Sequence, residues 1–157
     1  MKKVCEEKFE DILEKYSDTV TRILIMNLRN EEDAKDCYQE VFIKLYKRKW
    51  GFKDENHLKY WLIRVAINTC IDYQRKNYKS SIDIENVVVK SYDQYELIPN
   101  LLNIKQEYRN VLYLYYYQGY KIREIAKLLH QNENTIKTWM KRGKECLKKE
   151  MGGDYNE

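Results

Sequence analysis

Residues 50–76 read WGFKDENHLKYWLIRVAINTCIDYQRK, and this stretch decides how the first half of the chain folds. After a short polar loop, apolar residues recur at spacings of three and four from His57 to Lys76, which is the period of an amphipathic helix. The side that we expect to be buried comprises Leu58, Trp61, Leu62, Val65 and Thr69. The sequence therefore predicts a helix over residues 57–76 that packs one side into a core.

A second stripe runs along another side of the same predicted helix. It comprises Arg64, Asn68, Ile71 and Arg75, and the loop before the helix carries Trp50 and Phe52. Cations suit phosphates, an amide suits a base edge and an aromatic ring suits stacking, so the combination is typical of a surface for single-stranded nucleic acid. The simpler alternative is a core helix with a solvated basic face, which is common.

Two further helices are predicted before this stretch. The first runs from Phe9 to Met26; the second runs from Glu31 to about Lys49, with Asn30 as its N-cap and Asp33 as the capping-box partner. The stripe of the second helix that we expect to be buried comprises Ala34, Tyr38, Val41 and Leu45. Its opposite side carries Asp36, Gln39, Glu40 and Ile43. That side is either an ordinary surface or a small protein-docking face with an apolar centre and a charged rim.

Two runs in this half resemble segments of bacterial sigma factors. Residues 34–42, AKDCYQEVF, resemble the segment that binds core RNA polymerase. Residues 61–68, WLIRVAIN, followed by Asp72, Arg75 and Lys76, resemble the −10 recognition segment of the extracytoplasmic-function (ECF) group. The resemblance implies that Asp36, Gln39, Glu40 and Ile43 bind the polymerase clamp helices, and that Phe52, Lys53, Arg64, Asn68, Arg75 and Lys76 bind the −10 DNA.

The helical pattern returns at Leu101. A first helix buries Ile104, Tyr108, Val111, Leu112 and Tyr115 and ends at Gly119, and a second over residues 120–130 buries Ile122, Ile125, Ala126 and Leu129. A turn with Asn132 as N-cap then leads into a helix from Glu133 to about Met151, with Ile136, Met140, Gly143 and Leu147 inward. Lys137, Thr138, Lys141 and Arg142 face outward near its start. We expect a helix-turn-helix whose second helix enters the DNA major groove; a plain helical hairpin with a cationic surface is the alternative.

Residues 109–147 also resemble the −35 recognition domain of sigma factors. The resemblance rests on Arg109, the Gly119-Tyr120 break, and the runs Glu124-Ile125-Ala126 and Thr135-Ile136-Lys137-Thr138. It implies that Lys137, Thr138, Lys141 and Arg142 bind −35 DNA. The sequence departs from the family pattern at His130, Gln131, Trp139 and Gly143, where the family usually has Gly, an apolar residue, Arg and Ala.

The expected architecture is all-α, with two small helical domains joined by a flexible linker. Residues 1–78 form a three- to four-helix bundle of the sigma region 2 type, and residues 99–152 form the helix-turn-helix domain of the region 4 type. The linker, residues 79–98, is acidic and polar with only short apolar triplets, and residues 153–157 are a tail. One Pro and five Gly leave little room for an all-β fold rich in tight turns.

Charge and cysteine usage bound the function further. Residues 1–40 carry a net charge of −4 and the remainder +8, so the front suits a basic protein surface and the remainder suits phosphates. Cys5, Cys37, Cys70 and Cys146 are far apart without CxxC spacing, so neither a metal site nor a disulfide framework is expected. No apolar run suits a signal peptide or a membrane span, and we expect a cytoplasmic protein that is not inserted in a membrane.

We therefore expect an ECF-type sigma factor that binds core RNA polymerase and promoter DNA, reading −35 DNA as duplex and −10 DNA as melted strand. No enzyme motif, catalytic constellation or cofactor site is recognisable in the sequence. An anti-sigma factor is implied as a partner by the ECF resemblance alone. The alternative is a stand-alone helix-turn-helix transcriptional regulator that dimerises through its N-terminal helices.

Overall fold

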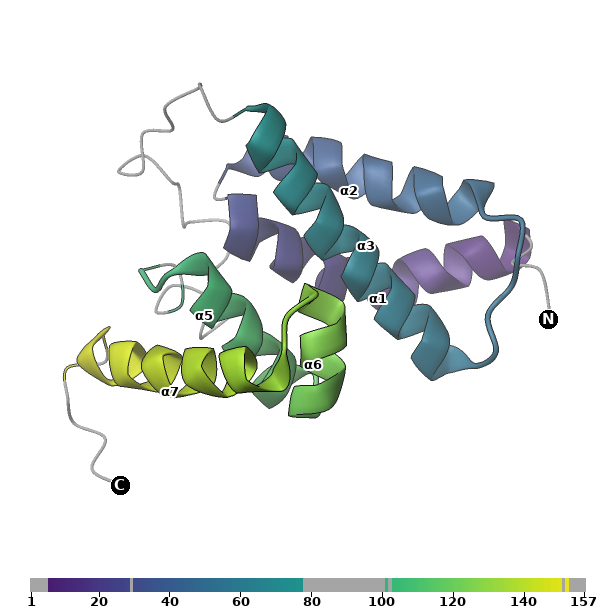
Figure 1. Ribbon diagram of the computed structural model, residues 1–157. Coiled ribbons are helices and arrows are strands. Elements are labelled where there is room, and N and C mark those ends of the chain that lie inside the picture. Colours follow the sequence, from purple (N-terminus) through teal and green to yellow (C-terminus); the bar gives the residue numbers. More distant parts are fainter. Residues whose placement is uncertain (1–5, 29, 78–100, 102, 151, 153–157) are drawn as a thin grey trace. The chain divides into compact units, whose positions relative to one another are not determined.

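The computed structural model describes residues 6–28, 30–77, 101, 103–150 and 152, with side chains from Phe9 onward in the first helix. Every regular element within these ranges is helical (Figure 1). The chain divides into two compact units, Met1–Val87 and Val88–Glu157. The all-α, two-domain prediction is therefore confirmed. The predicted linker, residues 79–98, and the tail lie outside the described residues, so their limits stay a prediction.

The first unit is a bundle of α1 (Glu6–Leu28), α2 (Glu31–Lys47) and α3 (Glu55–Lys76). Each helix packs against the other two, and α3 lies across both in Figure 1. The core is aliphatic, and its largest fully buried side chains include Ile23, Leu24, Leu45, Leu62 and Ile63. Burying each of these side chains contributes roughly 1.5–3 kcal/mol relative to leaving it in water. All three predicted helices are present; the start of α2 and the end of α3 are as predicted, and the other ends differ by two or three residues.

The turn between α1 and α2 is fixed by Asn30, as predicted. Its Oδ1 accepts hydrogen bonds from the backbone N–H groups of Glu32 (2.9 Å) and Asp33 (3.2 Å), which would otherwise lack partners at the helix start. Asp33, the predicted capping-box residue, accepts a hydrogen bond from the Tyr73 hydroxyl of α3. This bond raises the pKa of Tyr73 to about 12, and it ties the start of α2 to the end of α3.

The start of α3 is held in the same way. The Asp54 carboxylate accepts a hydrogen bond from the His57 backbone N–H at 2.8 Å and caps the helix. Glu55 accepts hydrogen bonds from Lys15 Nζ (2.9 Å) and the Tyr16 hydroxyl (2.7 Å) of α1, and these bonds lower the pKa of the Glu55 carboxyl. The C-terminal end of the loop between α2 and α3 is therefore anchored to the bundle.

The buried side of α3 differs from the predicted stripe. Its buried residues are Leu58, Leu62, Ile63, Ala66, Ile67, Thr69 and Cys70. Trp61 and Val65, which we expected in the core, are only half-buried, so that part of the prediction was wrong. The reason is that both α1 and α2 cover α3, which makes its buried arc broad and turns Trp61 and Val65 to the edge of that arc. They therefore border the stripe that carries Asn68.

Two cysteines of this unit behave as small buried hydrophobes, as predicted. Cys37 on α2 and Cys70 on α3 are buried. Burial raises the pKa of Cys37 to about 11 and also raises the pKa of Cys70. Both groups are thus neutral thiols near pH 7, and they contribute packing in the core.

The second unit contains α5 (Gln106–Leu112), a π-helical turn η3 (Tyr113–Tyr117), α6 (Ile122–Leu129) and α7 (Glu133–Glu150). Helix α7 packs on both α5 and α6. The core comprises Val111, Leu114, Ile125, Leu128 and Ile136, all nearly inaccessible to solvent. The predicted helix-turn-helix is formed by α6 and α7.

The π-helical turn changes which tyrosines are buried. A π turn holds more residues than an α turn, so the side chains that follow it rotate away from the positions that α-helical spacing predicts. Tyr113 and Leu114 are buried, whereas Tyr115, which we expected in the core, is 40% exposed. Tyr116 and Tyr117 are exposed as well. The prediction for Tyr115 was wrong because a regular helix was assumed up to Gly119.

Left-handed residues end both helices that precede a turn in this unit. Gly119 has φ +72°, and the next residue, Tyr120, donates its backbone N–H to the Leu114 carbonyl at 3.0 Å. His130 has φ 55° at the end of α6, and Gln131 donates to the Ala126 carbonyl at 2.9 Å. Gly119 therefore ends its helix as predicted. His130 adopts a conformation that costs roughly 1–2 kcal/mol for a residue with a Cβ atom.

Gly143 lies where α7 crosses α5. A Cβ atom added there would be 3.1 Å from Tyr108 Cβ and 3.1 Å from Leu112 Cδ1, which is tighter than ordinary packing. Glycine inside a helix costs about 1 kcal/mol relative to alanine. Here that cost accompanies a close approach of two helix backbones, which explains why this position departs from the family's alanine.

We predict that His130→Gly stabilises the second unit, because glycine adopts a positive φ without steric cost. The expected gain is about 0.5–1 kcal/mol in free energy of unfolding, since glycine also increases the entropy of the unfolded chain. The matched variant is Gly119→Ala, where a Cβ atom would meet no atom within 4 Å, so only backbone strain changes. It should destabilise the unit by about 1 kcal/mol. Hydrogen exchange of residues 106–150 in the full chain measures both, and equal signs for the two variants would contradict the prediction.

Candidate nucleic-acid interface

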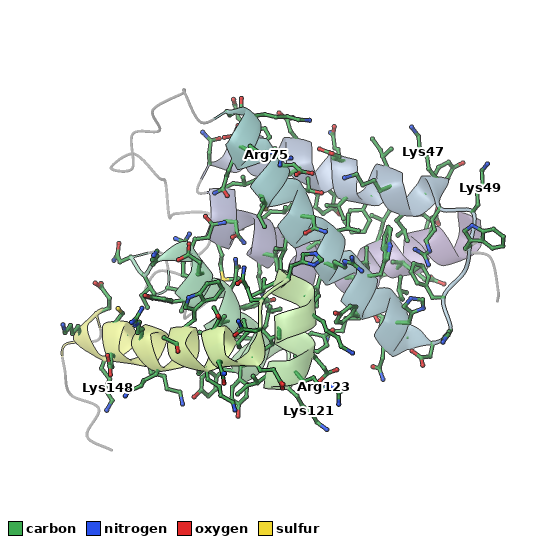
Figure 2. The ribbon with its side chains drawn as sticks, in the orientation of Figure 1. Lys47, Lys49, Arg75, Lys121, Arg123 and Lys148 are labelled. Carbon is green, nitrogen blue, oxygen red and sulfur yellow. The ribbon has the colours of Figure 1, made fainter. Side chains whose placement is uncertain are left out.

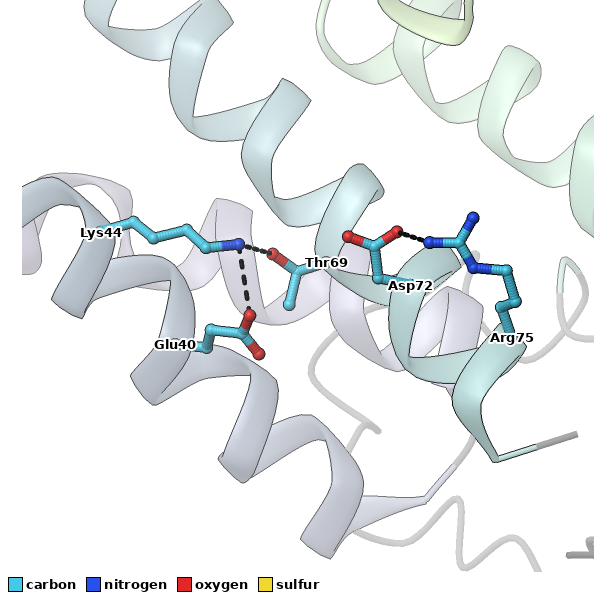
Figure 3. Close-up of polar contacts among 5 residues, drawn as sticks. All are labelled: Glu40, Lys44, Thr69, Asp72 and Arg75. Atoms are coloured by element: carbon cyan, nitrogen blue, oxygen red, sulfur yellow. Dashed lines mark hydrogen bonds and ion pairs between the residues drawn. The ribbon is translucent and has the colours of Figure 1, made fainter.

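The outward side of α2 is the first candidate surface. Asp36, Gln39, Glu40 and Ile43 are all exposed, and Ile43 is 50% exposed despite being aliphatic. Glu40 pairs with Lys44 at 3.2 Å, and Lys44 also donates to the Thr69 hydroxyl of α3 at 3.5 Å (Figure 3). The surface is thus an aliphatic side chain between carboxylates, one of which is already partly neutralised.

The basic stripe on α3 is the second candidate surface. Arg64, Arg75 and Lys76 are exposed, Asn68 is half-buried, and Ile71 is 47% exposed. Arg75 pairs with Asp72 at 2.9 Å within the same helix (Figure 3). An exposed pair of this kind is worth at most about 1 kcal/mol, so phosphate can displace the carboxylate without a large cost.

The loop before α3 presents one exposed aromatic ring and one packed ring. Trp50 is 71% exposed. Phe52 is half-buried, with its ring edge-on to those of Trp61 (5.5 Å between centroids) and His57 (5.3 Å). The Lys53 backbone N–H donates to His57 Nδ1 at 3.1 Å, and Lys53 is exposed.

The half-buried residues of α3 connect this loop to Asn68. Residues 61, 65 and 68 are separated by four and three, so Trp61, Val65 and Asn68 share one face of the helix. Phe52 packs on Trp61, and Asn68 lies seven residues beyond it, which is about 10 Å along the helix axis. The result is an apolar floor, Trp61 and Val65, with an aromatic wall at one end and an amide at the other. Sequence reasoning missed this floor because it placed both residues in the core.

Basic side chains flank this first unit at the end of α2. Lys47 and Lys49 are exposed and extend outward in Figure 2. Arg48, between them, is half-buried and turns back onto the loop, where its guanidinium lies 4.2 Å from the Phe52 ring centroid. No helical spacing predicts a role for Arg48, because it contacts residues that follow it in an irregular loop.

The second unit presents the helix-turn-helix as the third candidate surface. Asn132 caps α7 as predicted, because its Oδ1 accepts a hydrogen bond from the Thr135 N–H at 2.8 Å. All four predicted DNA-binding residues, Lys137, Thr138, Lys141 and Arg142, are exposed on α7. The Thr138 hydroxyl donates to the Asn134 carbonyl at 3.0 Å, which leaves its oxygen lone pairs and methyl group for a partner.

Three cations at α6 were not singled out from the sequence. Lys121, Arg123 and Lys127 are exposed, and Lys121 and Arg123 extend from the start of the helix in Figure 2. Their position in the sequence could have predicted phosphate contacts, because the first helix of a helix-turn-helix crosses the DNA backbone and cations there suit phosphates. Trp139, where the family usually has Arg, is half-buried.

The family comparisons match the two units in order. Residues 12–80 match the family Sigma-70 region 2, and residues 101–147 match Sigma-70, region 4. A bundle of the region 2 type followed by a helix-turn-helix of the region 4 type defines the class of protein, a sigma factor. No helix among the described residues is long and apolar enough to cross a membrane.

Individual relatives narrow the class. The chain is 27% identical to the ECF RNA polymerase sigma factor SigW of Bacillus subtilis over 96% of this chain and 92% of that protein. It is 29% identical to SigM of the same organism over 88% and 92% of the two chains. The sigma factor RpoE of Bartonella quintana, solved in complex with the anti-sigma factor NepR, shares the fold, with a TM-score of 0.75 at 18% identity over 95% of this chain and 99% of that one. The chain belongs to the ECF sigma factors.

We predict that Asp72→Asn strengthens binding of a single-stranded oligonucleotide, because it frees Arg75 from its ion pair and removes one negative charge. Affinity at low salt should rise several-fold, and the salt dependence should steepen by roughly 0.7, the contribution of one phosphate contact on a single strand. Fluorescence anisotropy over a salt series measures both quantities.

Glu10→Gln is the matched control, since Glu10 is exposed on α1 and the variant removes the same charge. It should raise the affinity for the oligonucleotide less than Asp72→Asn does, and it should leave the salt dependence of binding unchanged. The effect of Asp72→Asn should also vanish in an Arg75→Ala background. Equal gains from Asp72→Asn and Glu10→Gln would mean that the ion pair does not restrain Arg75.

Proposed function

We propose that this chain binds core RNA polymerase and directs promoter-specific initiation, with unit 1 capturing the melted −10 strand and unit 2 reading −35 DNA as duplex. One observation carries the proposal. The Trp61–Val65 floor lies between the Phe52 ring and the Asn68 amide, with Arg64 exposed beside it. A flat apolar floor, an aromatic wall and a base-edge donor and acceptor are the requirements of a pocket for an extruded base.

The energies of such a pocket are close to balance. Extruding a base from a duplex costs a few kcal/mol. Contact with an aromatic surface returns about 1–3 kcal/mol per base. The Asn68 amide adds selectivity, because it both donates to and accepts from a base edge. Stable melting therefore needs the polymerase in addition to this small unit, which fits a factor that acts only as part of a larger enzyme.

The phosphate backbone would be held by the cations around the pocket. Lys53 lies in the loop, Arg64 lies beside Asn68, and Arg75 with Lys76 ends α3, so all four can follow one strand along the helix. These contacts give affinity without sequence preference. Selectivity at the −10 element then comes from the pocket.

Docking on core polymerase would use the outward side of α2. Asp36, Gln39 and Glu40 surround Ile43, so charge would guide the encounter with a basic surface and the aliphatic centre would provide the lasting contact. We assign the clamp helices of the largest catalytic subunit as the partner surface. The names of the relatives SigW and SigM, both called RNA polymerase sigma factors, support RNA polymerase as the partner, and the choice of the clamp helices follows from the family resemblance of residues 34–42.

Reading of the −35 element would use the start of α7. Lys137, Thr138, Lys141 and Arg142 present cations and a hydroxyl where a helix of this motif enters the major groove. Lys121, the N-cap residue of α6, and Arg123 within α6 add phosphate contacts. Loss of one bidentate base contact costs roughly 1–3 kcal/mol, and it does so only for the matching sequence.

Regulation by an anti-sigma factor is part of the proposal. RpoE of Bartonella quintana, which shares this fold, was solved in complex with the anti-sigma factor NepR. An inhibitor that covers the α2 surface or the start of α7 would block polymerase or DNA binding. The function is non-enzymatic, since the chain would supply binding and orientation while the polymerase supplies the chemistry.

Reconstitution with purified core RNA polymerase of Bacillus subtilis tests the function as a whole. We expect association at low salt and transcripts that start at defined positions on genomic fragments, with weak DNA binding by the free chain. A stand-alone regulator would instead bind duplex DNA tightly by itself and form a stable dimer. Failure to associate with core enzyme, together with tight independent DNA binding, would replace the proposed function by that alternative.

The pocket is tested separately by Asn68→Ala. We expect unchanged affinity for core enzyme and an open-complex yield lowered about tenfold, which corresponds to the loss of one specific base contact. The control is Asn56→Ala, an exposed amide in the first turn of the same helix, which should open promoters like the wild type. Permanganate footprinting of melted thymines gives the yield. If the Asn68→Ala variant opens promoters as well as the wild type does, the assignment of Asn68 to the base pocket is wrong.

A further inference from the structure

The Arg48 side chain contacts the loop between α2 and α3, and none of the roles proposed above accounts for these contacts. It is the C-cap residue of α2, and its backbone N–H bonds the Leu45 carbonyl. Its side chain donates from Nε to the Trp50 carbonyl at 2.8 Å and from Nη2 to the Gly51 carbonyl at 3.4 Å. The guanidinium carbon lies 4.2 Å from the Phe52 ring centroid and 5.1 Å from that of Trp61.

These contacts act together on three successive residues of the loop. The carbonyl groups of Trp50 and Gly51 are drawn toward the end of α2, and the Phe52 ring is held between the guanidinium and α3. The other end of the loop is fixed independently by Asp54 and His57. The Trp50 side chain stays 71% exposed, so the same clamp that holds the loop backbone presents this ring to the solvent.

We propose that Arg48 is a positioning residue for −10 strand capture: it holds the loop 50–52 so that Phe52 walls the base pocket and Trp50 stands outside it. The proposal rests on the proposed function of the pocket. Arg48 acts through Phe52 and the loop backbone, and it does not itself hold a phosphate. Its neighbours Lys47 and Lys49 are exposed, whereas the Arg48 guanidinium is committed to the loop.

The geometry requires arginine and not merely a positive charge. A planar guanidinium can stack on an aromatic ring and donate hydrogen bonds from its edge at the same time. Lysine carries the same charge on a rounded ammonium group, which cannot make the stacked contact and both carbonyl bonds together. Arg48→Lys therefore separates a positioning role from a charge role without changing the net charge of the chain.

The same geometry defines how Phe52 can meet a base. One face of its ring is covered by the guanidinium, and the rings of Trp61 and His57 make T-shaped contacts with it. A base can reach only what these three groups leave open, so Phe52 serves as a wall of the pocket and not as one layer of a continuous stack. Loss of Arg48 would release the ring from that orientation.

The test compares Arg48→Lys and Arg48→Ala with Lys49→Ala in reconstituted holoenzyme. The DNA is a fork-junction template with a single-stranded −10 segment, either intact or carrying a single abasic site moved along that segment. We expect both Arg48 variants to bind core enzyme normally and to lose roughly tenfold in discrimination between intact and abasic templates. Lys49→Ala, which removes one exposed charge beside Arg48, should weaken both templates alike and keep the discrimination.

A double-mutant cycle with Phe52→Ala decides how Arg48 acts. If Arg48 works through Phe52, adding Arg48→Ala to Phe52→Ala changes discrimination little. Additive losses, or full activity of Arg48→Lys, would overturn the proposal and make Arg48 a phosphate contact. Hydrogen exchange of residues 49–54 in the free chain should increase in both Arg48 variants, whereas unchanged exchange would also overturn the proposal.

The outcomes distinguish failure of the proposed role of Arg48 from failure of the proposed function in transcription initiation. If the wild-type holoenzyme is active and the Arg48→Lys variant behaves like it, only the proposed role of Arg48 is wrong. A wild-type chain that neither joins core enzyme nor initiates transcription removes the proposed function, and the role of Arg48 in strand capture with it.

Discussion

The structure of the first unit depends on the packing of α3 against both α1 and α2. Because two helices cover it, α3 buries a broad arc that includes Leu62, Ile63 and Ile67, and only the remaining arc is left for a partner. That remaining arc carries Arg64, Asn68 and Arg75. Trp61 and Val65 lie at its border, where packing and exposure meet. The packing of the bundle therefore determines that Trp61 and Val65, the floor of the proposed pocket, are half-buried.

Each of the two outward surfaces of the first unit contains one charged side chain that is paired with a neighbour on its own helix. Lys44 pairs with Glu40 and reaches the Thr69 hydroxyl, and Asp72 pairs with Arg75. Exposed pairs of this kind are weak, so a partner with complementary charge can replace them at little cost. The same contacts restrain the side chains until that exchange happens. In the second unit, Gly143 lets α7, the helix that carries the predicted DNA-binding residues, approach α5 closely.

Loops in this chain are held by specific side chains and not by length alone. Asn30 and Asn132 cap the helices that follow them, and Asp54 does the same for α3. Arg48 extends this principle, because it holds the loop that carries the aromatic rings. Functional loops generally gain precision when their backbone carbonyl groups are bonded to a fixed element, since ordering then costs less entropy on binding.

Much of this arrangement follows from the sequence by itself. Spacings of three and four determined the helices, Asn30 and Asn132 determined their starts, and every predicted polymerase- or DNA-binding residue of the described units lies wholly or partly exposed. The tertiary structure alone decided how far α3 is rotated, the π-helical turn that exposes Tyr115, and the seat of Arg48 on Phe52. The physical reason is that periodicity determines which residues share a face, whereas the direction of that face and the contacts of an irregular loop depend on neighbours brought together by folding.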